Sequence, residues 1–204
     1  MWTEREIMAL DITELEFKYA ADHISLSDFM HLFSSRGLPL TVVNDSMDIY
    51  YTKLGMDGFQ RHRPAMRELT KKLKTSRHNN YHLIESDIYL DSRTTIEAVK
   101  FHLGLDGYQE SFRITKSNTI YNDAYLSYVY YTVTDEHNQT RNFIEVEVRK
   151  DKVEFLGREA FEMLISGERD LAYLGITSGD RLKQSLFEIY HVRNEYEKGY
   201  MGGR

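Results

Sequence analysis

Residues 14–19 read Glu14-Leu15-Glu16-Phe17-Lys18-Tyr19, so charged and apolar side chains alternate along this stretch. Successive side chains of a β-strand point to opposite faces of the sheet. The apolar residues therefore share one face, and Glu14, Glu16 and Lys18 share the other. The pattern predicts a strand with one apolar face and one charged face.

A second acidic strand with the same alternation lies far along the chain. From Ile144 to Arg149, apolar residues alternate with Glu145, Glu147 and Arg149. Basic residues predominate on two segments in between. Arg61 and Arg63 share a face of residues 58–63, and a face of residues 68–74 carries Glu68, Thr70, Lys72 and Lys74. The charges thus sort by type, with acids on two distant strands and bases mainly on the hairpin between them.

Composition limits the class of protein. The chain has 204 residues, 28% of them charged and 41% hydrophobic, which are ordinary values for a soluble globular domain. It has no cysteine and no apolar run long enough to span a bilayer, so we expect a cytoplasmic protein that does not act at a membrane. A formal net charge of -6 argues against a nucleic-acid partner. We expect one domain over residues 1–204, with its core over about 10–192.

Strand patterns dominate the middle of the chain, and helical patterns flank them. Ser25 and the apolar spacing after it predict a helix that runs to Gly37, and residues 94–103 and 159–165 predict two more. Residues 40–43 and 47–52 read as strand pieces, with a possible hairpin at residues 44–45. Further strands are expected at 58–63, 67–74, 81–90, 108–116, 120–135 and 140–150, and a last helix at 181–193. The class is therefore α+β.

Two interpretations of the charged faces remain open. An antiparallel sheet can bury its apolar face and leave its charged face in water. Alternatively, the sheet closes into an antiparallel β-barrel, helices cover its apolar side from outside, and the charges point inward. Charges inside a barrel are costly unless they pair, bind a metal or hold an ionic ligand. Paired carboxylates suit magnesium or manganese, and lysines and arginines opposite them suit phosphate oxygens.

The ordered motifs resemble the CYTH superfamily of triphosphate tunnel metalloenzymes. Residues 14–18 match the ExExK signature of that family. The segments at Tyr50-Tyr51-Thr52, 58–63, 69–72, 143–148 and 174–176 resemble later family strands in order, over about residues 10–192. The family includes class IV adenylate cyclases, thiamine triphosphatases and inorganic triphosphatases. The resemblance implies a closed barrel with a polar interior, the triphosphate tunnel.

The resemblance also implies roles for individual residues. Glu14, Glu16, Glu145 and Glu147 would bind Mg²⁺ or Mn²⁺. Catalytic and substrate-binding roles would fall to basic residues: Lys18, Arg61, Arg63 and Lys72, with Lys74, Arg113 and Lys116 as further substrate-binding residues. We expect metal-assisted hydrolysis of inorganic triphosphate or of a nucleoside or other organic triphosphate, by a monomer or homodimer. A class IV-type cyclase and a non-catalytic binder of a phosphorylated nucleotide or polyphosphate are the alternatives. Hydrolysis is favoured because no adenine pocket is visible in the sequence.

The chain departs from the family pattern in its basic half. The family carries a Lys-x-Arg pair on a later strand, whereas Lys116-Ser117-Asn118 ends in asparagine. Arg113 would replace the missing arginine if the strand register shifted. Asp135 is the available match for an aspartate that precedes the last acidic strand. The Asn118 substitution is the feature that favours a binder over an enzyme.

Overall fold

The structure is a computed structural model of the chain. It describes residues 10–74, 82–152 and 159–191, and for residues 10–14, 73–74 and 82–85 it describes the backbone alone. No helix in these ranges is long and apolar enough to cross a membrane.

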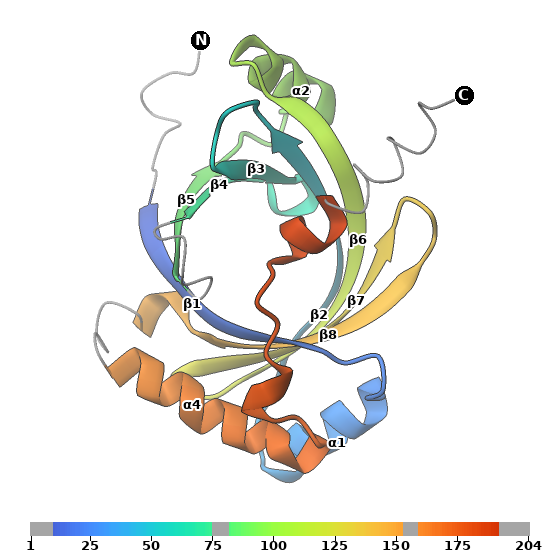
Figure 1. Cartoon of the computed structure of the whole chain (residues 1–204), viewed down its shortest axis with the longest axis vertical. Coiled ribbons are helices and arrows are strands. Elements are labelled where there is room, and N and C mark those ends of the chain that lie inside the picture. The colour runs from blue at the N-terminus through green and yellow to red at the C-terminus, as the bar shows by residue number, and fades with distance from the viewer. Residues whose placement is uncertain (1–9, 75–81, 153–158, 192–204) are drawn as a thin grey trace.

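A single curled antiparallel sheet forms the body of the molecule (Figure 1). Its strands follow one another around the ring in the order β1-β5-β4-β3-β2-β6-β7-β8, which is the order of a closed barrel. Their bounds are β1 Leu10–Ala20, β2 Leu40–Thr52, β3 Gly58–Arg63, β4 Glu68–Lys74, β5 His82–Tyr89, β6 Gln109–Asn122, β7 Leu126–Asp135 and β8 Thr140–Val148.

The ring of pairings meets at β1, whose two halves have different partners. Residues 10–15 pair with β5, and residues 16–20 pair with β8. No described residue of β1 is paired on both sides, so the sheet splays apart on either side of this strand. The α+β class and the curled antiparallel sheet are confirmed. The predicted closed barrel is present only in part, because β5 and β8 pair with different halves of β1.

Helices cover the outer, apolar face of the sheet. Helix α4 (Glu159–Leu171) lies against β1, β7 and β8, and α2 (Ile96–Leu105) lies by β6 (Figure 1). Phe29 and Phe33 of α1 (Leu26–Ser35) pack on tyrosine rings of β6 and β7. Phe17 and Tyr19 of β1 are fully buried in the cluster that α1 and α4 complete. A Cβ atom at Gly167 of α4 would lie 2.7 Å from Leu126 and Val146, so glycine lets this helix approach the sheet closely. The predicted cap at Ser25 is present, and Thr95 caps α2 in the same way.

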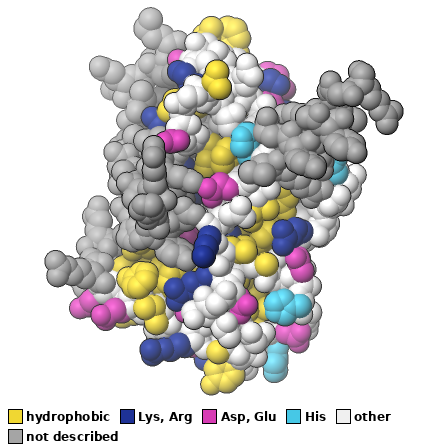
Figure 2. Space-filling view, in the orientation of Figure 1, with side chains coloured by type: hydrophobic (Ala, Val, Ile, Leu, Met, Phe, Trp, Pro, Cys, Tyr) yellow, Lys and Arg dark blue, Asp and Glu magenta, His cyan; other side chains and the backbone are white. Residues whose placement is uncertain are grey.

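The inner face of the sheet carries the charges on one side and aromatic residues on another. Tyr50, Phe112, Tyr131 and Phe143 form a buried inner cluster that the C-terminal segment completes with Leu186 and Tyr190. That segment crosses the ring in Figure 1, where its helical part, residues 186–191, lies inside the ring. In the space-filling view the ring shows charged and hydrophobic side chains at its surface and no open bore (Figure 2).

The C-terminal segment is anchored before it enters the ring. Arg181 forms an isolated β-bridge with Tyr19, and the Leu182 amide donates to the Lys18 carbonyl at 2.8 Å. The Arg181 guanidinium also pairs with Glu168 of α4, which accepts a hydrogen bond from the Tyr19 hydroxyl. The expected helix over 181–193 is therefore wrong at its start, because Arg181 is held in extended backbone by these partners.

The expected hairpin at residues 44–45 is also wrong. β2 runs without a break from Leu40 to Thr52 and pairs along its length with β6. The Asn118 amide donates to the Asn44 carbonyl and side-chain oxygens, at 3.3 and 3.1 Å. Cross-strand pairing thus overrides the local turn preference of Asn-Asp. The predicted hairpin of residues 58–74 is present, with a short 3-10 turn at Pro64–Met66.

Candidate active site

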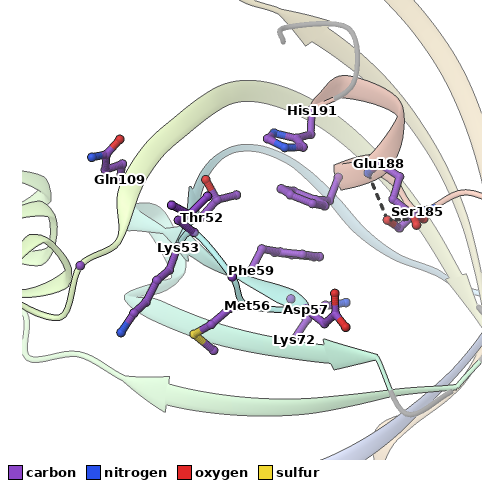
Figure 3. Close-up of a pocket in the computed structure, with 15 residues that line it drawn as sticks. Thr52, Lys53, Met56, Asp57, Phe59, Lys72, Gln109, Ser185, Glu188 and His191 are labelled. Atoms are coloured by element: carbon purple, nitrogen blue, oxygen red, sulfur yellow. Dashed lines mark hydrogen bonds between the residues drawn. The ribbon is translucent and has the colours of Figure 1, made fainter. Parts of the chain in front are cut away.

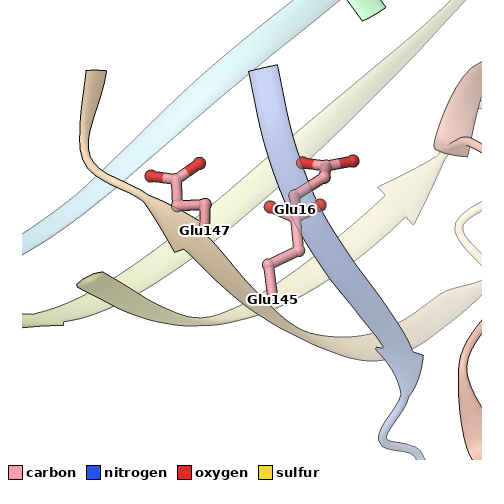
Figure 4. Close-up of side chains that lie close together, drawn as sticks. All are labelled: Glu16, Glu145 and Glu147. Atoms are coloured by element: carbon pink, nitrogen blue, oxygen red, sulfur yellow. The ribbon is translucent and has the colours of Figure 1, made fainter. Parts of the chain in front are cut away.

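Three carboxylates converge where β1 meets β8. Glu16 lies opposite Glu147 in the strand pairing, and Lys18 lies opposite Glu145. Carboxylate oxygens of Glu16, Glu145 and Glu147 all lie within 4.8 Å of one another (Figure 4). Among the side chains that the structure describes, this is the one acidic or histidine group close enough to share a metal ion. The alternation that predicted the two strands thus places their glutamates in one cluster.

Lys18 supplies a positive charge inside this acidic cluster. Its ammonium lies 2.9 Å from Glu16 Oε1 and 2.8 Å from Glu145 Oε1. Burial disfavours the ammonium, but Glu145 and Glu16 outweigh burial and hold the pKa of Lys18 well above its usual range.

The Glu145 carboxylate is oriented by residues of the two strands that flank β8, Lys18 of β1 and Tyr131 of β7. Burial alone would raise its pKa, yet Lys18 and Lys116 lower the pKa of Glu145 to about 2. The Tyr131 hydroxyl donates to Glu145 Oε1 at 2.7 Å. A carboxylate held in this way stays charged and fixed in direction, which suits a metal ligand.

Basic side chains from three strands face the same small cavity. Arg61 and Arg63 come from β3, Lys72 from β4 and Lys116 from β6, and the cavity of about 80 Å³ is lined by them and by the three glutamates. Ser185, Leu186 and Phe187 of the C-terminal segment close another side of it. The sequence predicted each of these basic residues for the site, and the structure brings them together with the acidic cluster.

Asp48 is an inner residue that sequence reasoning missed. Its side chain is fully buried, with Oδ2 at 2.9 Å from the Lys116 ammonium and Oδ1 at 3.6 Å from Arg63 Nε. Burial would raise its pKa, but Lys116, Arg61 and Arg63 hold the pKa of Asp48 far below its usual range. Burial also lowers the pKa of Lys116. Alternation along β2 was the available signal, because Asp48 shares its strand face with Ser46 and Tyr50.

A second carboxylate group lies beside the arginines. Glu68 Oε1 is 3.1 Å from Arg63 Nη1 and accepts a hydrogen bond from the Thr70 hydroxyl at 2.9 Å. The Thr70 oxygen also lies 2.7 Å from Asp87 Oδ1, so its one hydrogen is shared between the two carboxylates, and the Lys150 ammonium lies 2.8 Å from Asp87 Oδ2. The arginines of the basic side are therefore held in place by carboxylates.

Several predicted residues lie elsewhere or outside the described part. Arg113 lies on the outer face of β6 and pairs with Glu110, so the expected register shift does not occur. Arg113 and Lys116 are three residues apart on a stretch of β6 that pairs with β2 without a break, so alternation places Lys116 inside and Arg113 outside. Asp135 accepts from the backbone amides of His137 and Gln139 in the β7–β8 turn and takes no place in the cavity. Glu14 and Lys74 lie on β1 and β4, but their side chains are outside the described residues.

Comparisons with known proteins bear on the fold. No model of a known protein family matches the sequence. No curated protein matches it either.

Solved structures match over most of the chain. A conserved hypothetical protein from Pyrococcus furiosus is similar with a TM-score of 0.63 and 21% identity, over 86% of this chain and 98% of that one. A candidate adenylate cyclase from Vibrio parahaemolyticus has a TM-score of 0.60 at 14% identity, over 89% and 99%. A candidate adenylate cyclase from Bacillus halodurans has a TM-score of 0.57 at 13% identity, over 87% and 96%. At these identities the likeness shows a shared fold alone, the curled antiparallel sheet with flanking helices.

Proposed function

We propose that this chain is a divalent-metal-dependent triphosphatase of the CYTH type, which hydrolyses a triphosphate inside the charged cavity. One observation carries the proposal: the carboxylates of Glu16, Glu145 and Glu147 face Arg61, Arg63, Lys72 and Lys116 across a single cavity. The acidic cluster would bind a metal ion, and the basic cluster opposite would bind the phosphates attached to that ion. The similarity of the fold to two candidate adenylate cyclases supports the same class of substrate.

The acidic cluster fits a hard divalent cation. Three carboxylates within 4.8 Å repel one another, and Lys18 supplies one positive charge against them. Carboxylate oxygens are the ligands that Mg²⁺ and Mn²⁺ prefer. Glu16, Glu145 and Glu147 would hold such an ion, with Glu14 on the same strand as a further predicted ligand. Such an ion would polarise a phosphoryl oxygen and make a bound water more acidic.

The basic side chains would grip the phosphate oxygens. Arg61 and Arg63 present planar guanidinium groups, which bind two oxygens of a phosphate at once. Lys72 and Lys116 add point charges at two other walls of the cavity. Asp48 and Glu68 hold these groups in place before the substrate arrives, so little reorganisation is needed. Positioning and charge stabilisation of this kind supply most of the acceleration in phosphoryl transfer.

A non-catalytic binder is the second candidate, and Asp48 is the observation that favours it. The buried carboxylate of Asp48 already neutralises part of the positive charge of Lys116 and Arg63. This partial neutralisation leaves less positive charge to stabilise the transition state of hydrolysis. Binding of a phosphorylated ligand in its ground state needs less of that charge.

Phosphate release tests the proposal. We expect release from tripolyphosphate or ATP in the presence of Mg²⁺ or Mn²⁺, and none above background after addition of a chelator. A Glu16→Gln/Glu145→Gln double variant should lose this activity. Glu162→Gln, an exposed glutamate of α4, is the matched control and should keep it. Tight binding of these compounds without turnover would contradict the hydrolase and support the binder. Cyclic AMP and pyrophosphate formed together from ATP would indicate a cyclase.

A further inference from the structure

A second and larger cavity opens beside the charged one. It has a volume of about 700 Å³ and lies between the β2–β3 loop, the start of β6 and the helical part of the C-terminal segment (Figure 3). Cavities of a few hundred to about 1,000 Å³ are the usual size of sites for small organic ligands. The proposed hydrolysis of phosphates in the inner cavity does not require this larger cavity.

The two cavities adjoin. Phe59, Lys72, Ser185 and Phe187 line both of them. Lys72 therefore stands at the junction, with Arg61 and Arg63 on the inner side alone. The phosphates of a substrate bound among the basic residues would extend past Lys72 toward the larger cavity. An organic group attached to these phosphates would then lie in the larger cavity.

The wall of the larger cavity is a row of nearly parallel aromatic rings. The ring centroids of Phe59 and Phe187 are 4.4 Å apart with an angle of 17° between the planes, and those of Phe187 and His191 are 4.8 Å apart with 14°. His191 is fixed in this row by a hydrogen bond of 2.9 Å between its Nδ1 and the Ser111 hydroxyl.

These rings are only partly buried, unlike the core aromatics behind them. Phe59, Phe187 and His191 are half-buried, whereas Phe112 and Phe143 are 2% and 0% exposed. An aromatic row that keeps its exposed edge toward a cavity can contact the ring of a ligand, and every planar ring has a face that can stack.

Polar groups also line the larger cavity. Thr52 offers a hydroxyl, Gln109 an amide and Asp57 a carboxylate (Figure 3). Together they can accept and donate hydrogen bonds to the hydroxyl and amino groups of an organic ligand. We do not assign Glu188 to ligand binding, because its carboxylate accepts a hydrogen bond from the Ser185 amide at 2.8 Å and caps the helical segment.

From this lining we infer that the larger cavity binds a planar, hydrogen-bonding organic group attached to the phosphates, as in a nucleoside triphosphate. The inference rests on the proposed function, because the inner cavity must first hold the phosphates. It also makes the substrate organic, although no adenine pocket is visible in the sequence. Gln109 and His191 line only the larger cavity and would determine this selectivity.

The test compares kcat/KM for ATP, GTP and CTP with kcat/KM for tripolyphosphate, each with Mg²⁺ and with Mn²⁺. We expect at least one nucleotide to be preferred by about tenfold or more, the usual value of a stacked ring. In Gln109→Ala and in His191→Ala the ratio of nucleotide to tripolyphosphate should fall about tenfold. Because the two variants change different elements, a folding defect in one leaves the other informative. His31→Ala, an exposed histidine of α1, is the control and should keep the wild-type ratio.

The outcomes separate the inference from the proposed function. Hydrolysis of tripolyphosphate in preference to every nucleotide would overturn the inference and leave the triphosphatase standing. Equal losses on all substrates in Gln109→Ala and His191→Ala would overturn it too. Neither binding nor turnover of any of these compounds with either metal would overturn the triphosphatase and the inference together.

Discussion

The acidic and basic sides of the cavity are built in different ways. The acidic side comes from two paired strands, with Glu16 opposite Glu147 and Lys18 opposite Glu145. The basic side comes from β3, β4 and β6, and buried carboxylates lie among its cations. On the acidic side three carboxylates lie within 4.8 Å of one another, a repulsion that a bound cation would relieve, whereas Asp48 and Glu68 already lie beside the cations of the basic side. We therefore expect the loss of one glutamate to weaken the site more than the loss of one base.

The largest effect should come from the acidic side. Glu147→Gln removes one carboxylate of the cluster while keeping its size, so the metal is held less well. We expect kcat/KM to fall by about 100-fold or more, as when one preorganised charge-stabilising group is lost. The rise in Tm on addition of Mn²⁺ should shrink as well. An unchanged Tm response to Mn²⁺ in Glu147→Gln would break the comparison, because the metal would then bind elsewhere.

A smaller effect is expected on the basic side. Lys116→Met removes a buried cation that faces the cavity, and we expect kcat/KM to fall by about 30-fold, mainly through KM. Arg113→Met changes a cation of the same strand that lies on the outer face, and its kcat/KM should change by less than about twofold. Steady-state kinetics on both variants would check the assignment of faces. Equal losses in the two would contradict it.

Asp48 on the basic side should make the stability of the fold depend on pH. Its folded pKa lies below its unfolded value near 3.8, so Asp48 stabilises the fold above about pH 4. This contribution is lost as the pH falls through the lower, folded pKa. Asp48→Asn should reduce the free energy of unfolding at pH 7 by about 1.5 kcal/mol, because Lys116, Arg61 and Arg63 lose their carboxylate.

The Asp48→Asn variant should also bind tripolyphosphate several-fold more tightly, since its bases are less compensated. Urea unfolding between pH 3 and pH 7 measures the first effect, and calorimetric titration the second. Wild type and variant with parallel pH profiles would show that Asp48 does not compensate the basic side.

The smallest effect concerns the orientation of one metal ligand. Tyr131→Phe removes the hydroxyl that donates to Glu145 Oε1, and we expect Mn²⁺ affinity to fall by about tenfold or somewhat less. Tyr130→Phe is the matched control on the outer face, where the hydroxyl donates to the Ile24 carbonyl. A Mn²⁺ titration of both variants distinguishes orientation of the ligand from loss of packing, because Tyr130→Phe should bind Mn²⁺ like the wild type.

The acidic side was predictable because it depends only on alternation. Once residues 14–19 and 144–149 are strands, the glutamates of each strand must share a face. The pairing of β1 with β8 then brings the two sets of glutamates together. The same rule applied to β2 would have placed Asp48 inside. That residue was missed although it lies in the predicted strand piece 47–52, because its face there carries Tyr50 and Thr52 and no second charge to mark it.

Other features depend on long-range contacts that no local pattern contains. The start of the last helix follows from the pairing of Arg181 with Glu168, which lies on a different helix. The larger cavity joins the β2–β3 loop to residues 185–191, and only the fold brings these segments together.

One measurement tests the metal-bound phosphate site most directly: anomalous diffraction from crystals grown with Mn²⁺ and tripolyphosphate. We predict a manganese peak at coordination distance, about 2.1–2.5 Å, from carboxylate oxygens of Glu16, Glu145 and Glu147. We also predict phosphate density between that ion and Arg61, Arg63 and Lys72. Manganese bound away from the three glutamates, or phosphate bound outside the ring while the inner cavity stays closed by Leu186 and Phe187, would contradict the proposed site.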